Sequence, residues 1–428
     1  MQSARSKTYN RYDVYLFLII VSAIYRNYGI IHPSSFLSVI FFPQLLRNSR
    51  ILRLNNIRSL AAFLLFWLSY ALISFTWGPD RHEVVLDTTL LFLNSMLFLE
   101  IIVFSLKAKR PLQTLAFAWV CAFLITSVVA VWEINTDHHL NSAKEVKDFR
   151  KDALGETMDK DYAVFTFYNP NTYAYYICLA FPIVLYLFFQ SKKRLDHIRY
   201  LVPVILIIYI MSKNSSRGGL LTLAITLSTF LYFKMKGSSF RGKVYMIMCI
   251  VLLGLFLVLY GEIIFQALFF RLSKNDLFED NARIVIWLAS WRGFLDSYGF
   301  GQGAGSMIPV LEASKDIPFE IYYSHNMIME LLLEYGLLIT IGILLFLYRL
   351  FVLGIRINDS NIKSMVVGTI LAFPFYSVIN SENINLTFLW MFFATIYVFC
   401  INSVPNPQKN KYIMKKNNIP DLSKVKGI

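Results

Sequence analysis

The chain has 428 residues, a formal net charge of +14, 56% hydrophobic residues and 16% charged residues. Soluble domains are about 45–50% apolar and about 25% charged, so this chain has too few charges to cover its apolar surface in water. The composition excludes a disordered chain, a fibrous repeat and a soluble nucleic-acid-binding protein, and it predicts an integral membrane protein.

Twelve apolar segments approach the roughly 20 residues that a helix needs to cross a membrane. In chain order they are Asp13–Ala23, Ile30–Leu46, Leu60–Trp77, Thr88–Leu106, Thr114–Val131, Asn171–Phe189, Tyr200–Met211, Gly218–Phe233, Val244–Tyr260, Met327–Tyr348, Met365–Val378 and Asn385–Val404. The first, seventh and eleventh are short, and the first two can instead form one broken hairpin. The range is ten to twelve spans, and we expect about twelve in an all-α bundle of membrane helices.

The basic residues indicate how these spans are oriented. If the N-terminus is cytoplasmic and the spans alternate, the cytoplasmic segments hold 27 of the 41 Lys and Arg residues but only three acids, Asp196, Asp359 and Asp421. This is the positive-inside pattern of membrane proteins. We therefore expect a multi-pass protein with both termini in the cytoplasm, in contact with membrane lipids and with no nucleic-acid partner.

The same pattern divides the chain into a single transmembrane domain, residues 1–404, and a basic cytoplasmic tail, residues 405–428. Two long loops, about 132–170 and 261–326, are external, so we expect function on the external face. Within the second loop, Ala282–Leu295 predicts a helix, which is either an amphipathic helix at the membrane interface or a plain surface helix. Its apolar stripe consists of Ile284, Trp287, Leu288, Trp291 and Leu295.

The sequence offers no metal or disulfide framework. The cysteines Cys121, Cys178, Cys249 and Cys400 lie inside apolar runs without CxxC spacing, so we expect free thiols. The external loops lack clustered acids or a histidine pair at metal-ligand spacing. We therefore expect no metal and no cofactor.

Arginines at the external face are candidate anion-binding residues. Arg217, in Ser215-Ser216-Arg217-Gly218-Gly219, opens the eighth span, where its guanidinium and the helix dipole favour an anion. Arg283 opens the predicted interfacial helix, and Arg292 is a weaker candidate of the same kind. Each can equally serve as an interfacial anchor or contact a lipid headgroup.

The segment from Gly299 to Ser306 is rich in glycine. It follows a helix rather than a strand and lacks a Lys-Ser/Thr ending, so it is neither a dinucleotide-binding turn nor a P-loop. Ala304 occupies the position where a nucleophile elbow requires glycine. We expect a tight turn that lets the backbone approach a neighbour closely.

His325 precedes the tenth span, in which Glu330 and Glu334 share one helix face. Acids this deep in a span are expected to face a cavity or a partner group. A histidine at the mouth of such a cavity is either a general base or a hydrogen-bonded interfacial residue.

Together these segments resemble the O-antigen ligase and polymerase family of bacterial membrane proteins. The resemblance covers roughly Asn169 to Ile341 and rests on the order of Phe167-Tyr-Asn169-Pro170-Asn171, Ser-Ser-Arg217-Gly-Gly, Ala-Arg283-Ile-Val-Ile-Trp287, Gly299-Phe-Gly-Gln-Gly303, His325-Asn326 and Glu334-Tyr-Gly336.

This resemblance implies a GT-C-like, metal-independent glycosyltransferase in the bacterial plasma membrane. The donor would be an oligosaccharide on undecaprenyl pyrophosphate, with a flippase and a chain-length regulator as further candidate partners. His325 would then be the catalytic residue, and the substrate would be bound by Arg217, Arg283, Arg292, Asn326 and Glu334. The product would be an O-antigen, a capsule or a teichuronic-acid-type polymer. Ligation of O-antigen onto lipid A-core is an alternative, and a transporter or lipid-linked glycan flippase is a third.

Overall fold

The computed structural model describes residues 9–25, 32–136, 138–140, 162–167, 169–214, 216–237, 239–240, 244, 277–314, 317, 323–380 and 383–404. These residues form helices and contain no strand, which confirms the predicted all-α bundle. The α-helices are α1 (Arg11–Ser22), α2 (Pro33–Arg47), α3 (Asn55–Ile73), α4 (Arg81–Lys107), α5 (Pro111–Thr136), α7 (Pro170–Gln190), α8 (Arg194–Asn214), α9 (Arg217–Gly237), α12 (Leu277–Asp296), α13 (Met307–Glu312), α14 (Met327–Arg356), α15 (Ser360–Tyr376) and α16 (Thr387–Ser403).

Seven helical segments among the described residues are long and apolar enough to cross a membrane: Ile57–Thr76, α4, α5, α7, α8, α9 and α14. The shorter helix α16 is also apolar. Eleven of the twelve predicted spans coincide with helices. The ninth, Val244–Tyr260, lies outside the described residues apart from Val244. The total of about twelve spans stays a prediction.

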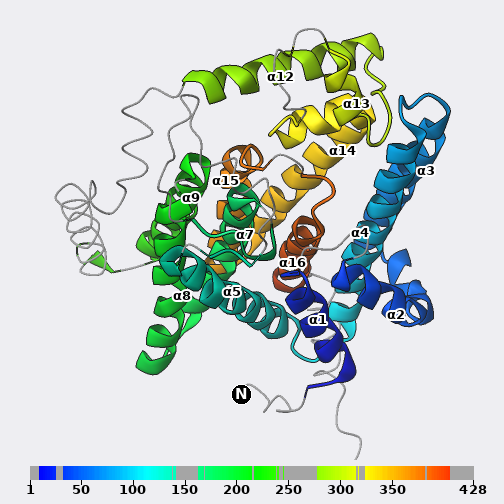
Figure 1. Cartoon of the computed structure of the whole chain (residues 1–428). Coiled ribbons are helices and arrows are strands. Elements are labelled where there is room, and N and C mark those ends of the chain that lie inside the picture. The colour runs from blue at the N-terminus through cyan, green and yellow to red at the C-terminus, as the bar shows by residue number, and fades with distance from the viewer. Residues whose placement is uncertain are drawn as a thin grey trace, which may run out of the picture.

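The helices run between two ends of the bundle (Figure 1). At one end, called the site end below, α9 and α14 begin and α8 and α15 finish, and Met327 N–H donates to Ser377 O at 3.0 Å. At the opposite end, Asp13 of α1 accepts hydrogen bonds from the backbone N–H groups of Lys109 and Arg110 at 3.2 and 3.0 Å. The described parts of the basic loops that were predicted to be cytoplasmic lie at this opposite end.

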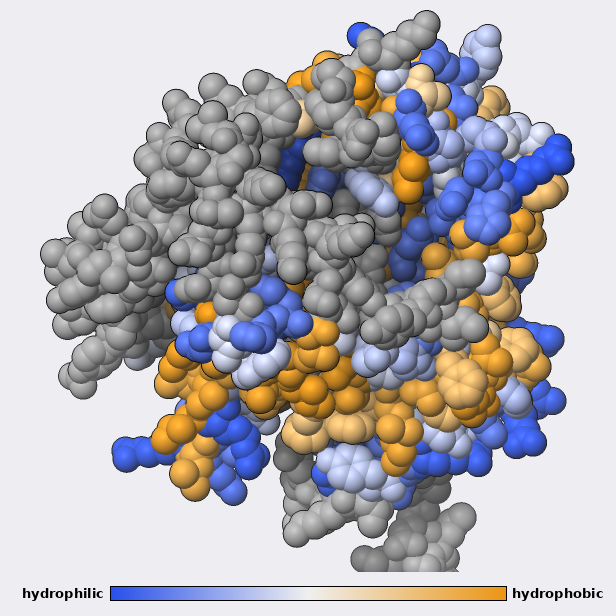
Figure 2. All heavy atoms as spheres, in the orientation of Figure 1, coloured by the Kyte–Doolittle hydropathy of each residue, from blue (hydrophilic) through white to orange (hydrophobic). Residues whose placement is uncertain are grey.

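The interior of the bundle is packed with large aromatic side chains. Trp67, Trp119 and Tyr335 are almost fully buried, and Trp67 meets Tyr335 edge to face with ring centroids 5.3 Å apart. Aromatic pairs of this geometry add to the stabilisation from burial alone. On the outside, helices expose apolar residues such as Leu65 and Leu72, and Figure 2 shows hydrophobic residues gathered in a band with hydrophilic residues above and below it.

Three of the four cysteines are described. Cys121, Cys178 and Cys400 are free thiols, as predicted, and Cys178 and Cys400 are buried. Cys249 lies outside the described residues. The thiols therefore act here as packing groups within the helices.

Candidate functional site

Helix α12 lies across the site end of the bundle (Figure 1), and the predicted helix Ala282–Leu295 falls within it. Its buried face, with Ile286 and Ala289, packs against α13 and against Leu333 of α14. Four of the five residues of the predicted apolar stripe are exposed: Ile284, Leu288, Trp291 and Leu295. The helix is thus apolar on both sides, and contact of the exposed stripe with lipid stays a prediction.

The fifth stripe residue, Trp287, has a different role. Its indole Nε1–H donates to the carbonyl oxygen of Ser324 at 2.6 Å. This bond joins α12 to the residue immediately before His325. Arg283 stands one helical turn before Trp287 on the same helix, so α12 brings this arginine toward the histidine.

The backbone on both sides of His325 is fixed by hydrogen bonds. Asn326 caps α14, since its side-chain oxygen accepts from Ile328 N and Met329 N at 3.0 and 3.4 Å. His325 itself has a φ of 47°, a left-handed conformation that is uncommon for residues other than glycine and that clusters at functional sites. The backbone that carries the imidazole is therefore held on both sides.

The imidazole of His325 has an unusual electrostatic environment. Burial and the nearby Arg283 charge together lower the pKa of His325 to about 4, because both disfavour the protonated form. Its Nδ1 is buried and has no hydrogen-bond partner among the described residues. His325 is therefore neutral at pH 7, and its Nδ1 is left unpaired by the described residues.

Arg217 occupies the first position of α9 and is exposed at the site end. The start of α9 is fixed by Ser216, whose Oγ accepts from Gly219 N at 3.3 Å. Gly218 lies close to α15, because an added Cβ would stand 3.2 Å from Ile379 Cγ1 and 3.3 Å from Phe375 O. The C-terminal end of α15 also binds the start of α14, so Arg217 and His325 are carried by two helices that meet at the same helix end.

Arg292 is placed differently from Arg283. It is exposed. It lies nine residues after Arg283, and this spacing places it on the opposite side of α12. The structure thus brings Arg283 close to His325 and does not bring Arg292 there. Roles in substrate binding for both arginines stay predictions.

The glycine-rich segment forms the close backbone contact that was expected. Gly299, Gly301, Gly303 and Gly305 all have positive φ angles. Gln302 N–H and Gly303 N–H donate to the carbonyl oxygens of Leu333 and Glu334 at 2.7 and 3.0 Å. Leu337 N–H in turn donates to Gly299 O at 2.9 Å, next to Gly336, where φ 71° and ψ −171° break the helix. The glycine-rich segment therefore replaces one turn of hydrogen bonds in α14.

The two acids of α14 hold backbone rather than lining an empty cavity. Glu330 is 2% exposed and accepts from Asn383 N, Asn383 Nδ2 and Ile384 N at 2.9–3.1 Å. Glu334 is 3% exposed, and its Oε1 accepts from Met307 N at the start of α13, at 3.2 Å. The predicted partner of each acid is thus a backbone amide. A substrate contact by Glu334 stays a prediction.

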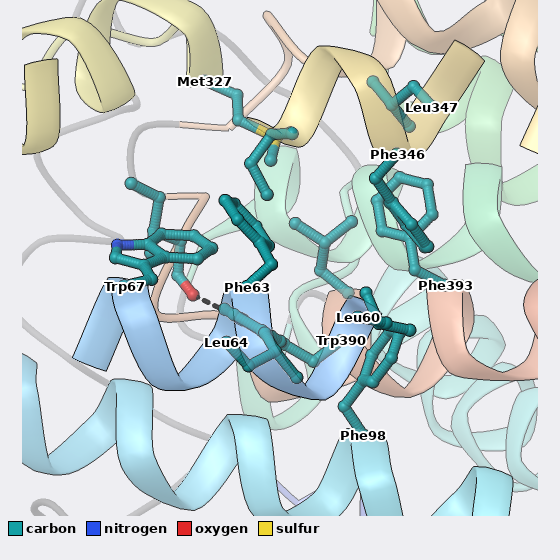
Figure 3. Close-up of a pocket in the computed structure, with 13 residues that line it drawn as sticks. Leu60, Phe63, Leu64, Trp67, Phe98, Met327, Phe346, Leu347, Trp390 and Phe393 are labelled. Atoms are coloured by element: carbon teal, nitrogen blue, oxygen red, sulfur yellow. Dashed lines mark hydrogen bonds between the residues drawn. The ribbon is translucent and has the colours of Figure 1, made fainter. Parts of the chain in front are cut away.

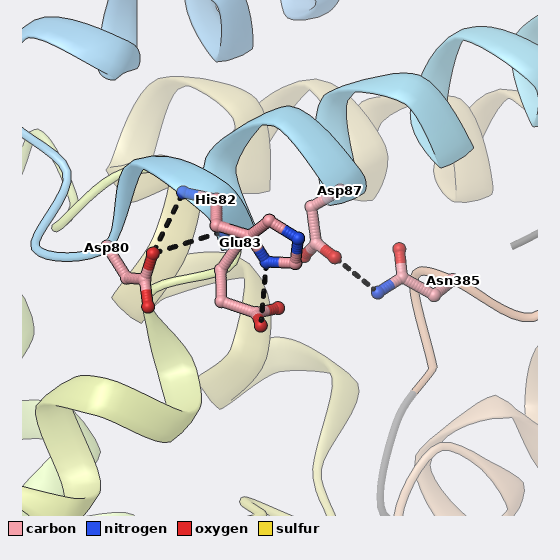
Figure 4. Close-up of polar contacts among 5 residues, drawn as sticks. All are labelled: Asp80, His82, Glu83, Asp87 and Asn385. Carbon is pink, nitrogen blue, oxygen red and sulfur yellow. Dashed lines mark hydrogen bonds and ion pairs between the residues drawn. The ribbon is translucent and has the colours of Figure 1, made fainter. Parts of the chain in front are cut away.

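Polar residues at the start of α4, which no motif in the sequence indicated, also lie at the site end. Asp80 caps α4 through His82 N and Glu83 N at 2.8 and 3.4 Å, and one turn further Asp87 accepts from Asn385 Nδ2 at 3.0 Å (Figure 4). Asp87 is 8% exposed. The feature of the sequence that could have indicated Asp87 is its position immediately before the predicted span that begins at Thr88.

An apolar cleft of about 50 Å³ lies between α3 and α14, with α4 and α16 beneath it (Figure 3). Met327, two residues after His325, lies at one end of this cleft, and Phe346 and Leu347 of α14 lie further along it. Its lining is entirely hydrophobic: Leu60, Phe63, Leu64, Trp67, Phe98, Met327, Ile343, Phe346, Leu347, Ile384, Leu389, Trp390 and Phe393. Of the residues that line the cleft, Met327 is thus the one that lies next to the His325 segment in the chain.

The described residues contain no group of three or more His, Cys, Asp or Glu side chains placed to hold a metal ion. The carboxylates nearest to the site accept backbone N–H groups instead, as Glu330 and Glu334 do. The positive groups described at this end include Arg217 of α9 and Arg283 and Arg292 of α12.

Comparison with known proteins finds a family that part of this chain matches. Residues 202–347 match the O-antigen ligase family. The chain is also similar to the teichuronic acid biosynthesis protein TuaE of Bacillus subtilis (strain 168), with 24% identity over 358 residues that cover 80% of this chain and 71% of that protein. The family match includes Arg217, Arg283 and His325, and thus falls on the segments that build the site end.

Proposed function

We propose that the chain transfers a glycan from a lipid pyrophosphate carrier to a sugar hydroxyl, because residues 202–347 match the O-antigen ligase family and the chain is similar to a teichuronic acid biosynthesis protein. The observation that carries this proposal is the neutral, partly buried His325 beside Arg283, at the end of the bundle where Arg217 opens α9. A proton acceptor beside a cationic group that can hold the leaving anion is what such a transfer requires.

The donor is an oligosaccharide linked to undecaprenyl pyrophosphate. Arg217 at the first turn of α9 combines a guanidinium with the positive end of a helix dipole, and Arg283 supplies a second charge. When the bond between the anomeric carbon and the pyrophosphate oxygen breaks, the electron pair leaves with the pyrophosphate. Arginines that hold this group stabilise the charge that develops on it, and no metal is needed for that purpose.

The acceptor hydroxyl loses its proton to His325 as its oxygen bonds to the anomeric carbon. In the empty site the Arg283 charge keeps the pKa of His325 low. A bound pyrophosphate offsets that charge, which makes the imidazole a better proton acceptor once the donor is present. Binding of the donor therefore makes His325 better able to accept the proton of the acceptor hydroxyl.

The apolar cleft supports a lipid carrier. It begins at Met327, close to His325, and offers only hydrophobic side chains along its length. A polyprenyl chain entering there would leave its pyrophosphate at the site end. The cleft and the arginines together match a ligand with an apolar tail and an anionic head.

The product is a surface polysaccharide, made by joining repeat units. The name of the relative, a teichuronic acid biosynthesis protein, favours a polymer of repeating sugars, as does the Asn169-Pro170-Asn171 segment. Ligation onto lipid A-core would use the same site with a different acceptor. The site end faces outward from the plasma membrane, with both termini in the cytoplasm, since the basic loops lie at the opposite end.

The test is glycan transfer by the purified full-length chain in proteoliposomes. The vesicles receive a polyprenyl-pyrophosphate-linked repeat unit, no ion gradient and a chelator of divalent cations. We expect new glycosidic bonds and release of polyprenyl pyrophosphate. Movement of the donor between leaflets without bond formation would instead identify a flippase. Bond formation that stops with the chelator and resumes with a divalent ion would contradict the metal-independent mechanism.

A further inference from the structure

The end of α8, three residues before Arg217, is joined to the first long loop by the buried side chain of Asn214. Asn214 is the last residue of α8 and is 7% exposed. Its Oδ1 accepts from Ala163 N at 2.8 Å, and its Nδ2 donates to Ala163 O at 3.1 Å and to Pro170 O at 3.4 Å. Asparagine provides an acceptor and two donors in one plane, so it can pair with both backbone groups of Ala163.

The same loop segment is held from its other side by Glu133 of α5. The carboxylate is 1% exposed and accepts from Val164 N and Phe165 N, both at 2.8 Å. Residues 162–167 are all buried, and hydrogen bonds to a charged carboxylate are stronger than those between neutral groups. Residues 163–165 are thus held in place between α5 and α8, and Asn214 is anchored to them.

The position of Arg217 depends on the turn that follows Asn214. Arg217 is three residues beyond Asn214, and Gly218 is already packed against α15. The chain is therefore fixed on both sides of the arginine: by Asn214 before it and by the α9–α15 contact after it. Without the Asn214 contact, the beginning of α9 would lose its connection to Ala163.

We propose that Asn214 is a positioning residue that holds the α8–α9 turn on Ala163 so that Arg217 can bind the pyrophosphate of the donor. The inference rests on the proposed function, in which Arg217 contacts this group. Asn214 itself does not touch the donor. Its effect passes through Arg217, so removing both side chains should weaken binding no more than removing the arginine alone.

The test is a double-mutant cycle in which a fluorescent polyprenyl pyrophosphate without glycan is bound to the purified full-length chain. We expect Asn214→Ala to weaken binding by about 10-fold or more, since small displacements of a binding group are costly. Arg217→Ala should weaken it further, and adding Asn214→Ala to Arg217→Ala should change it by less than about 2-fold. Asn214→Asp, which keeps the size but cannot donate to Ala163 O, is expected to behave like Asn214→Ala and serves if the alanine variant does not fold.

Asn48→Ala is the matched control, because the Asn48 amide donates to Tyr12 Oη at 3.2 Å and Gln44 O at 2.7 Å at the opposite end of the bundle. It should bind the probe normally. Normal binding by folded Asn214→Ala and Asn214→Asp, with weak binding by Arg217→Ala, would overturn the positioning role and leave the proposed function standing. Losses that multiply in the double variant would likewise overturn it. Normal binding by Arg217→Ala would overturn both proposals.

Discussion

Replacing Gly336 by alanine should destabilise the protein strongly, because two separate costs fall on this one residue. Gly336 has φ 71° and ψ −171°, a region open essentially to glycine alone, and other residues there cost about 1–3 kcal/mol. An added Cβ would also meet backbone of the glycine-rich segment, including Gly299 O at 2.5 Å. Overpacking of this kind typically costs about 1–3 kcal/mol, so we expect a total of about 2–6 kcal/mol.

The reciprocal position and a control are available in the same chain. Gly301 has φ 89°, and a Cβ there would lie 2.5 Å from Gly336 N and 2.7 Å from Glu334 O, so Gly301→Ala should be similarly damaging. Gly237, at the end of α9, has no atom within 4 Å of an added Cβ. Gly237→Ala should therefore leave stability nearly unchanged or raise it slightly.

The assay is thermal unfolding in detergent, followed by tryptophan fluorescence at one scan rate for all variants. Gly336→Ala and Gly301→Ala should unfold well below the parent protein, and Gly237→Ala should unfold with it. If Gly336→Ala were as stable as Gly237→Ala, α14 would not be broken at Gly336. The contact between the glycine-rich segment and α14 would then be wrong.

Three further predictions concern the site and its orientation. Arg217→Lys should lower glycan transfer by roughly 10-fold or more although the charge is kept, because lysine lacks the planar pair of guanidinium donors. Near-normal transfer by Arg217→Lys would show that Arg217 acts only as an electrostatic anchor. The acid limb of kcat/KM should lie near pH 4 rather than near pH 6.5, because the pKa of His325 in the empty site is lowered to about 4 and the imidazole accepts a proton only above that pH. A limb near pH 6.5 that disappears in His325→Gly and His325→Gln would contradict the burial of the imidazole. A reporter active only in the cytoplasm should be on when fused after Lys243 and off when fused within 281–323, and the same state at both points would refute the orientation.

The sequence predicted the helices well because hydropathy and length decide what can cross a membrane. Eleven predicted spans coincide with helices, with ends that differ by several residues, as in α8, where Arg194–Asn214 extends the predicted Tyr200–Met211 at both ends. The cytoplasmic side of the basic loops stays a prediction. These features depend on local composition, which a single sequence displays directly.

The sequence could not predict which contacts the polar residues make. Asn214 bonds to Ala163, 51 residues earlier, and Glu133 bonds to Phe165, 32 residues later, so neither pairing leaves a local signal. Glu330 and Glu334 were correctly placed on one face, but only the fold reveals that backbone amides meet them. On α12 the periodicity identified the apolar stripe, yet the helix packs through its other side, because both faces carry apolar residues.

The central claim is that the arginines hold a lipid pyrophosphate while His325 accepts the proton of the acceptor. The most direct test measures donor binding and glycan transfer side by side in His325→Ala, with His82→Ala as a control, since His82 is an exposed histidine at the same end of the bundle. We expect His325→Ala to bind the lipid-linked donor normally and to lose transfer by about 10²–10⁴-fold, the usual contribution of a general base, while His82→Ala keeps both. Full transfer by His325→Ala would contradict the claim, and loss of donor binding in that variant would make His325 a pyrophosphate ligand instead.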